Sequence, residues 1–227
     1  PDPQPLPCIW MFPGHAGTQG GFLVDEPWKE GFHARVSRLL RTGALPPVRF
    51  AIPDLWNRFG GCQTLDSTAT GPYERHLWEE LKPALERRFA TSRHGAAGHS
   101  SGGYGALVQA IRHPGIVQGV ACHAGDMAFD LSYAPDFPRA AARIVAEGGV
   151  EGFVAAFERA LKKQESRWYS GINVVAMAAA YSPDPRAPLG LALPFDLHTC
   201  RRVDEVWERW LALDPVRLAA EAPVRDT

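Results

Sequence analysis

The chain has 227 residues, of which 45% are hydrophobic and 22% charged, and its formal net charge at pH 7 is -1. This length suits a single α/β domain, and the balanced charge argues against a nucleic-acid partner. No apolar run approaches the roughly 18 residues that a membrane-spanning helix needs. The first residues lack the basic start and apolar centre of a signal peptide, which favours a cytoplasmic location.

The first half of the chain alternates between short apolar runs and helical patterns. Residues 7–12 (PCIWMF) are typical of a buried parallel strand, and they lead into a glycine loop. A helix is predicted over 28–42 and a second strand over 48–54. Pro72 suits the start of another helix, whose apolar residues recur every fourth position, and Pro83 is expected to kink it.

The middle of the chain continues this alternation. It predicts a short strand at 94–98, a helix over about 102–113 and a strand at 116–122. Strands and helices that alternate at short intervals indicate a mostly parallel sheet with helices on both faces. The predicted fold class is therefore α/β.

The pattern becomes helical from Pro138 onward, and no strand is evident after Cys122. Asp214, followed by a proline, is predicted to cap one more helix. The proline-rich segment 182–196 is interpreted as a surface loop. We expect one domain over 1–227, in which residues 138–213 are either a helical cap or part of the core.

The cysteines are widely spaced and form no C-x-x-C pair that would hold zinc. Their number is too small for a disulfide framework. We therefore expect buried free thiols at Cys8, Cys62, Cys122 and Cys200.

A serine between glycines stands where the 94–98 strand is predicted to turn into a helix. Gly98, Ser100 and Gly102 fit the pattern G-x-S-x-G in the strand-to-helix context that a nucleophile elbow requires. Glycines beside the serine let strand and helix pack closely around a strained backbone. The backbone N–H of Ser101 is then a candidate oxyanion donor at the start of the helix.

A second oxyanion donor is expected from the loop after an earlier strand. The loop FPGHAG, residues 12–17, lies there, and the backbone N–H of His15 is the candidate. The alternative is a simple glycine turn.

Several segments together resemble one family. GHSSGGYGAL, the upstream FPGHAG, PD followed by RFGGCQ, HAGDMAF and MAAAYSPDP with the later LPFDL resemble the esterase D and enterochelin-esterase-like branch of the α/β-hydrolases. The resemblance covers nearly the whole chain. It implies a serine hydrolase that cleaves carboxylic esters or thioesters through an acyl-enzyme on Ser100, with oxyanion positions at His15 and Ser101. It implies no metal and no cofactor.

The resemblance also implies that the fold is truncated. In these hydrolases an acid and a histidine follow the serine, on loops after further strands, and no such strands are evident here. Three explanations stay open: a fragment, completion by another polypeptide, or a substitute base within the chain. His123, with Asp126 to orient it, is the internal candidate, and the alternative for His123 is an ordinary pocket-wall residue. The competing function is therefore a catalytically incomplete homologue that binds a ligand or partner without turnover.

Two further expectations concern the surroundings of the serine. Trp56, Arg58 and Phe59 either line a substrate pocket or pack beneath their loop. A sheet that ends with the 116–122 strand exposes an apolar edge, so we expect a dimer, a second chain or the later helices along it. The remaining histidines are interpreted as surface or supporting residues: His33, His76, His94, His99, His113 and His198.

Overall fold

The computed structural model describes residues 4–25, 27–61, 63–160 and 166–221. The chain divides into two compact units. The first, here called the sheet unit, comprises residues 1–55 and 75–125; the second, the helical unit, comprises residues 56–74 and 126–227.

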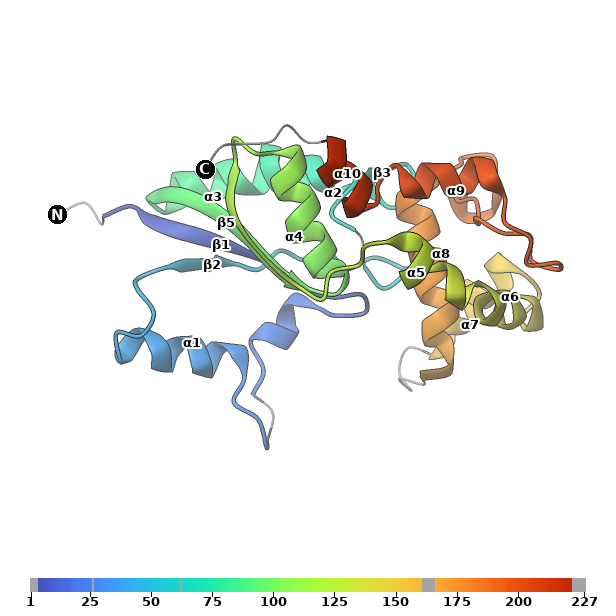
Figure 1. The fold of residues 1–227 in the computed structure, drawn as a ribbon. Helices are drawn as coiled ribbons and strands as arrows, with labels where there is room; N and C mark the ends of the chain where they lie inside the picture. The colour runs from blue at the N-terminus through green and yellow to red at the C-terminus, as the bar shows by residue number, and fades with distance from the viewer. Residues whose placement is uncertain (1–3, 26, 62, 161–165, 222–227) are drawn as a thin grey trace. The chain divides into compact units, whose positions relative to one another are not determined.

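The sheet unit is built on four parallel strands: β1 (Leu6–Phe12), β2 (Arg49–Ala51), β5 (Thr91–His99) and β6 (Val117–His123). Their order across the sheet is β2-β1-β5-β6 (Figure 1). The predicted α/β class with a mostly parallel sheet is thereby confirmed. β5 is longer than the expected 94–98 because it pairs with β1 on one side and β6 on the other.

Helices lie on both faces of this sheet, as predicted (Figure 1). On one face α4 (Ser101–Arg112) packs against β1, β5 and β6. The buried Trp10 faces the same layer, because its ring meets Trp78, whose indole N–H donates to Gln109 of α4. The helix α1 (Phe32–Arg41) lies on the other face. The ring centroid of Phe32, its first residue, is 5.2 Å from that of Phe50 in β2.

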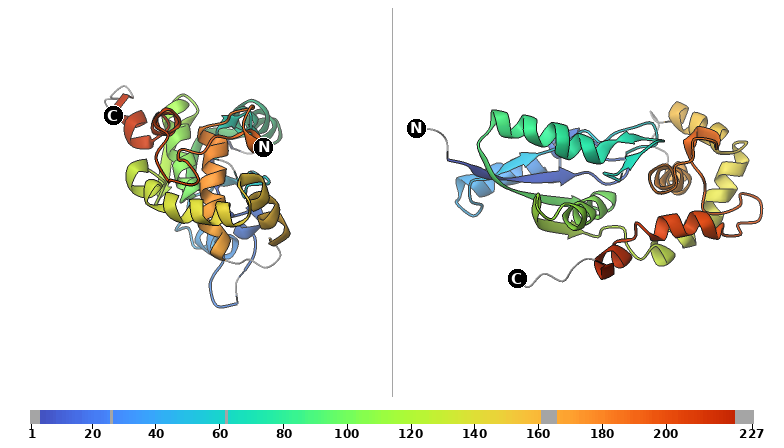
Figure 2. Two further views of the ribbon diagram at one scale, coloured as in Figure 1. Left: turned by 90° about the vertical axis from the view of Figure 1, so that its right-hand side faces the viewer. Right: turned by 90° about the horizontal axis from the view of Figure 1, so that it is seen from above.

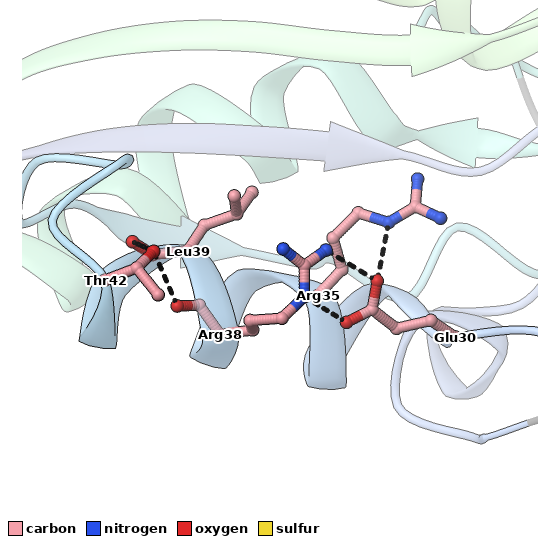
Figure 3. Close-up of polar contacts among 5 residues, drawn as sticks. All are labelled: Glu30, Arg35, Arg38, Leu39 and Thr42. Atoms are coloured by element: carbon pink, nitrogen blue, oxygen red, sulfur yellow. Dashed lines mark hydrogen bonds and ion pairs between the residues drawn. The ribbon is translucent and has the colours of Figure 1, made fainter.

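The helix α1 begins four residues later than the sequence pattern predicts. Gly31, with extended backbone, precedes its first turn, and Trp28 is 97% exposed. Before the helix, Glu30 accepts two hydrogen bonds from Arg38, at 2.7 and 2.8 Å, and one from Arg35 at 3.4 Å (Figure 3). These ionic hydrogen bonds tie the entering loop to the helix.

The chain reaches β5 through one helical run, formed by α2 (Tyr73–Arg75), a π-helical segment His76–Leu81 and α3 (Lys82–Arg88). The sequence predicts a kink at Pro83. In the structure the turn before Pro83 is wider than that of an α-helix, because Lys82 N–H donates to Leu77 O, five residues back. Proline has no N–H to donate and its ring crowds the carbonyl four residues earlier, which explains the wider turn.

The strand β6 forms one edge of the sheet. Residues 118–123 are exposed, and among the described residues no strand pairs with the outer side of β6. The face opposite α4 is also open here, as a hollow of about 360 Å³ that Ile9, Gly95 and Gly119 help to line. The predicted apolar edge is therefore present in the sheet unit.

The helical unit confirms the helical pattern predicted after Pro138. Its two strands, β3 (Asp66–Ser67) and β4 (Gly71–Pro72), form a small hairpin that the sequence analysis missed. The central helix is α8 (Tyr169–Tyr181), and most of its side chains are buried. It packs against α6 (Phe137–Ala146) and α7 (Val150–Ala160) (Figure 2). The remaining helices are α5 (Phe129–Ser132), α9 (Asp204–Leu211), α10 (Pro215–Glu221) and the short 3-10 turns Ala134–Asp136, Ser166–Trp168 and Pro188–Gly190.

The segment 182–196 is irregular, as predicted, but it is not simply a surface loop. Leu191 and Phe195 are only 3% and 2% exposed, and the Phe195 ring lies 4.7 Å from that of Phe137 in α6. Prolines mark the absence of regular structure, whereas burial is decided by the apolar side chains between them.

The expectation of buried thiols is right for Cys8 and wrong for two others. Cys122 is exposed and Cys200 half-buried, and all three are free. Burial raises the pKa of Cys8 to about 11, which leaves it as an unreactive thiol. Cys62 lies outside the described residues.

The predicted cap at Asp214 is confirmed and has a second role. Its carboxylate accepts from Val216 N–H in α10 at 3.0 Å, and also from the backbone N–H groups of Ala128 and Phe129 at 3.0 and 2.7 Å. The side chain thus holds the starts of α10 and α5 together.

Replacing this carboxylate should destabilise the helical unit. We expect Asp214→Ala to lower the free energy of unfolding by about 1–3 kcal/mol, because buried N–H donors lose their acceptor. Urea denaturation followed by circular dichroism measures the change, with Glu205→Ala, at an exposed residue of α9, as the control. An equal, small effect of both variants would contradict the double role of Asp214.

The cluster before α1 makes a pH prediction. Hydrogen bonds from Arg38, and then from Arg35, hold the pKa of Glu30 at about 2, below the usual range. A lowered pKa means that the ion pairs are complete at neutral pH and are lost as the pH falls toward 2. NMR titration of the Glu30 carboxylate should show a rise of this pKa in Arg38→Ala and no change in Arg41→Ala, and the absence of a rise in the first variant would refute the pairing.

Candidate active site

Ser100 stands at the turn between β5 and α4, as the motif predicts. Its backbone has φ 56° and ψ -127°, outside the regions that residues with a side chain normally occupy. The strand before it and the twelve-residue helix after it hold this conformation. Such strain is common at functional sites, and it presents the side chain at the tip of a sharp turn.

The glycines around Ser100 are required by close backbone contacts. A Cβ on Gly98 would overlap the carbonyl group of Gly102, and a Cβ on Gly102 would overlap the carbonyl group of Phe12 in β1. A Cβ on Gly103 would meet Gly125 Cα at 2.9 Å. The helix α4 therefore meets two strands backbone to backbone, and the turn is fixed from both sides.

The loop after β1 lies beside Ser100. A Cβ on Gly14 would be 3.5 Å from Ser100 Cβ and 3.2 Å from His99 O. The turn is closed by Gly17 N–H, which donates to Gly14 O at 2.9 Å. His15 is half-buried within this turn, and Ser101 is buried in the first turn of α4. The two candidate oxyanion residues thus belong to segments that flank Ser100, and their roles stay predictions.

The backbone of His123 adjoins that of Ser100, while its ring turns to another neighbour. Ser100 N–H donates to His123 O at 3.1 Å. The ring lies beside that of His99, with 4.9 Å between the centroids. In the described part of the sheet unit, no acidic side chain hydrogen-bonds the His123 ring. Its role as a base stays a prediction.

The other predicted site residues belong to the helical unit. Asp126 accepts a hydrogen bond from Tyr133 Oη at 2.8 Å. Arg58 forms an ion pair with Glu158 at 3.1 Å, and the Trp56 carbonyl accepts from Tyr73 Oη at 3.0 Å. The neighbouring Phe59 is 1% exposed, which supports the packing interpretation for that ring. The contribution of Trp56 and Arg58 to a substrate pocket, and of Asp126 to orienting His123, stay predictions.

His94 is buried, which excludes the surface interpretation and leaves that of a supporting residue. Trp10 Nε1 donates to its Nδ1 at 3.1 Å, so its Nε2 carries the proton and donates to Glu86 at 2.9 Å. Burial would raise the pKa of Glu86, but hydrogen bonds from His94 and Lys82 outweigh this and lower it. The alternation of side chains along a strand could have predicted this burial. His94 lies two residues before the buried Ala96, so both side chains point to the same face of the sheet.

A hollow of about 260 Å³ adjoins the elbow within the sheet unit. Its lining includes Met11, Phe12, Phe22, His99 and His123, with glycine and alanine residues between them. The part of the chain that the structure describes contains no cluster of three or more histidine, cysteine or acidic side chains arranged to hold a metal. Nor does that part contain a helix of the length and apolarity required to span a bilayer.

Solved structures similar to this chain include proteins named as esterases and hydrolases. A ferulic acid esterase is 20% identical with a TM-score of 0.47, over 54% of this chain and 47% of that one. The fluorophosphonate-binding serine hydrolase FphF of Staphylococcus aureus is 14% identical with a TM-score of 0.44, over 57% of this chain and 46% of that one. An S-formylglutathione hydrolase from Agrobacterium tumefaciens is 17% identical with a TM-score of 0.43, over 92% of this chain and 72% of that one. The alignments with the first two span less than half of those proteins.

No curated protein matches the sequence. A family model does: the Esterase family, described as "Putative esterase", matches residues 59–221. Because this match covers more than half of its residues, the chain belongs to the Esterase family.

Proposed function

We propose that this chain is a carboxylesterase-type serine hydrolase that acts on small-molecule esters or thioesters, with Ser100 as nucleophile. The observation that carries the proposal is the strained backbone of Ser100 between β5 and α4, in a chain of the Esterase family. A serine forced to the tip of a strand-to-helix turn has little structural value, because a glycine would adopt φ 56° with less strain.

The reaction would proceed through an acyl-enzyme. Ser100 Oγ attacks the ester carbonyl carbon as a base removes its proton, and the carbonyl oxygen becomes an oxyanion. The backbone N–H groups of His15 and Ser101 stabilise this oxyanion, aided by the positive end of the α4 dipole. The tetrahedral intermediate then expels the alcohol or thiol, which takes up the proton. Water attacks the acyl-serine, releases the acid and regenerates Ser100.

The base in this proposal is His123, oriented by Asp126. Proximity supports the choice of His123, since its carbonyl accepts the Ser100 N–H at 3.1 Å. In the same proposal, Trp56 and Arg58 contribute to the pocket for the acyl or alcohol group. These steps use the chain's own side chains and backbone, and they call on no cofactor.

A second function is favoured by one observation. The His123 ring packs against His99, and no acidic side chain in the described sheet unit holds it. Without an orienting carboxylate a histidine is a weak base for serine. The second candidate is therefore a catalytically incomplete homologue that binds a ligand or partner in the same pocket without turnover.

Hydrolysis of p-nitrophenyl acetate by the purified chain separates the two functions. We expect hydrolysis above the uncatalysed rate, its complete loss in Ser100→Ala, and no change in Ser92→Ala, an exposed serine of β5. If His123 is the base, His123→Ala should lower kcat by about 10²–10⁴-fold, the usual contribution of general-base catalysis.

Two outcomes would contradict this assignment. Equal rates for wild type and Ser100→Ala would remove the esterase proposal and favour binding without turnover. An active wild type with an equally active His123→Ala would show that the base is another group.

We also propose that β6 pairs with a second copy of the chain. Residues 117–123 carry no lysine, proline or acidic residue that would discourage edge pairing. Two antiparallel copies of an uncharged strand meet without charge repulsion.

We expect light scattering to report a dimer of the wild-type chain. The side chain of Val120 is 45% exposed, and the variant Val120→Lys should shift the dimer to monomer. A wild-type monomer at high concentration would refute this pairing.

A further inference from the structure

We propose that His99 and His123 form a two-histidine binding site for a transition-metal ion, with Cu²⁺ preferred over Ni²⁺ and Zn²⁺. The site lies wholly within the sheet unit, at the ends of β5 and β6. It is independent of the esterase proposal, because it concerns the binding of an ion and not turnover.

The strand register brings the two rings together. His99 and His123 are the last residues of β5 and β6 and pair directly in the parallel ladder. Residues paired in this way project from the same face of a sheet. The ring centroids are 4.9 Å apart, and the planes are inclined by 50°. Backbone hydrogen bonding therefore fixes the Cβ positions of both residues before any ligand arrives, while each ring can still rotate about its side-chain bonds.

Both imidazoles are available to a ligand. The two residues are exposed, and in the described chain the contact of each ring is with the other ring. Other histidines are differently engaged: His94 uses both ring nitrogens, and His76 Nδ1 lies 2.7 Å from Glu80. A histidine binds metal through a neutral ring nitrogen, so an uncommitted neighbouring pair is what chelation requires.

The spacing suits two adjacent positions on one ion. A metal–nitrogen bond is about 2.0–2.1 Å long, which places two adjacent imidazole nitrogens about 3 Å apart. Each ring nitrogen lies about 1 Å from its ring centroid, so rotation about the side-chain bonds brings nitrogens of the two rings to that separation. No movement of β5 or β6 is needed.

The surroundings leave room for further ligands. The hollow of about 260 Å³ beside the pair accommodates water molecules that complete the coordination. Met11 lines the same hollow, and its thioether sulfur is of the type that serves as a weak axial ligand at copper sites. Imidazole sites of this kind follow the general order in which Cu²⁺ binds most tightly, which sets the expected preference.

An ion at this site would sit beside the proposed nucleophile. His123 O accepts the Ser100 N–H, and Ser100 directly follows His99. A metal bound to His123 would occupy the ring lone pair that a general base uses. If both proposals hold, the ion therefore inhibits hydrolysis.

The test is calorimetric titration of the purified, tag-free chain with CuCl₂, NiCl₂ and ZnCl₂ in a buffer that does not chelate. We expect one saturable site per chain, tightest for Cu²⁺, weakening as acid protonates the ligands. His99→Ala and His123→Ala should each lower the affinity for Cu²⁺ by about tenfold or more, the size of effect seen when a metal site loses support. The matched control, His33→Ala, removes a lone exposed histidine of α1 and should leave the affinity unchanged.

Electron paramagnetic resonance of the Cu²⁺ complex gives a readout that misfolding cannot imitate. The wild type should show coupling to two imidazole nitrogens, and His99→Gln to one, with circular dichroism confirming that the variant is folded. Unchanged affinity in either single variant, or two-nitrogen coupling that persists without His99, would overturn the proposal. Neither result depends on whether the chain hydrolyses esters.

Discussion

The candidate site depends on one close packing contact, where α4 meets β5 and β1 backbone to backbone. Side chains at Gly98 and Gly102 would overlap the main chain of the neighbouring elements, so the contact exists only because these positions are glycine. It also forces the chain to reverse within one residue, and Ser100 takes up that reversal at φ 56°. The strain of about 1–3 kcal/mol usual for such a residue is held by the pairing of β5 on both sides and by α4.

The same packing arranges the neighbours of Ser100. The loop after β1 has to pass beside the turn, because β1 pairs with β5 up to Phe12 and Gly98. Gly14 then approaches Ser100 closely enough that a side chain there would crowd it. On the other side β6 ends in register with β5, so the His123 carbonyl accepts the Ser100 N–H. Gly14, Ser100 and His123 are distant in sequence but lie close together, because they stand at the carboxyl ends of the parallel strands β1, β5 and β6.

Local sequence predicted the elements whose cause is local. Periodicity, Gly98 and Gly102 were enough to predict the existence of β5, the turn at Ser100 and α4, whereas the full length of β5 depends on its pairing with β1 and β6. The burial of His94 was missed because its donor, Trp10, lies 84 residues away and its acceptor lies on α3. Likewise, segment 182–196 contains turn residues that predict a loop, whereas the packing of Phe195 on α6 comes from tertiary structure. The small hairpin of β3 and β4 has two residues per strand, too few for any periodic signal.

The pairing of His99 with His123 places two chemistries in competition at one strand end. Register puts both rings on the face of the sheet, where they are exposed and close enough to share an ion. Catalysis would require His123 to turn from that partner toward Ser100 and a carboxylate to hold it there, since an unoriented imidazole rarely meets the serine in a productive geometry. Under our two proposals, a bound ion favours the first arrangement and a carboxylate that orients the ring favours the second. If both proposals hold, the group that reaches the His123 ring therefore decides whether this elbow works as a catalyst or as a binding site.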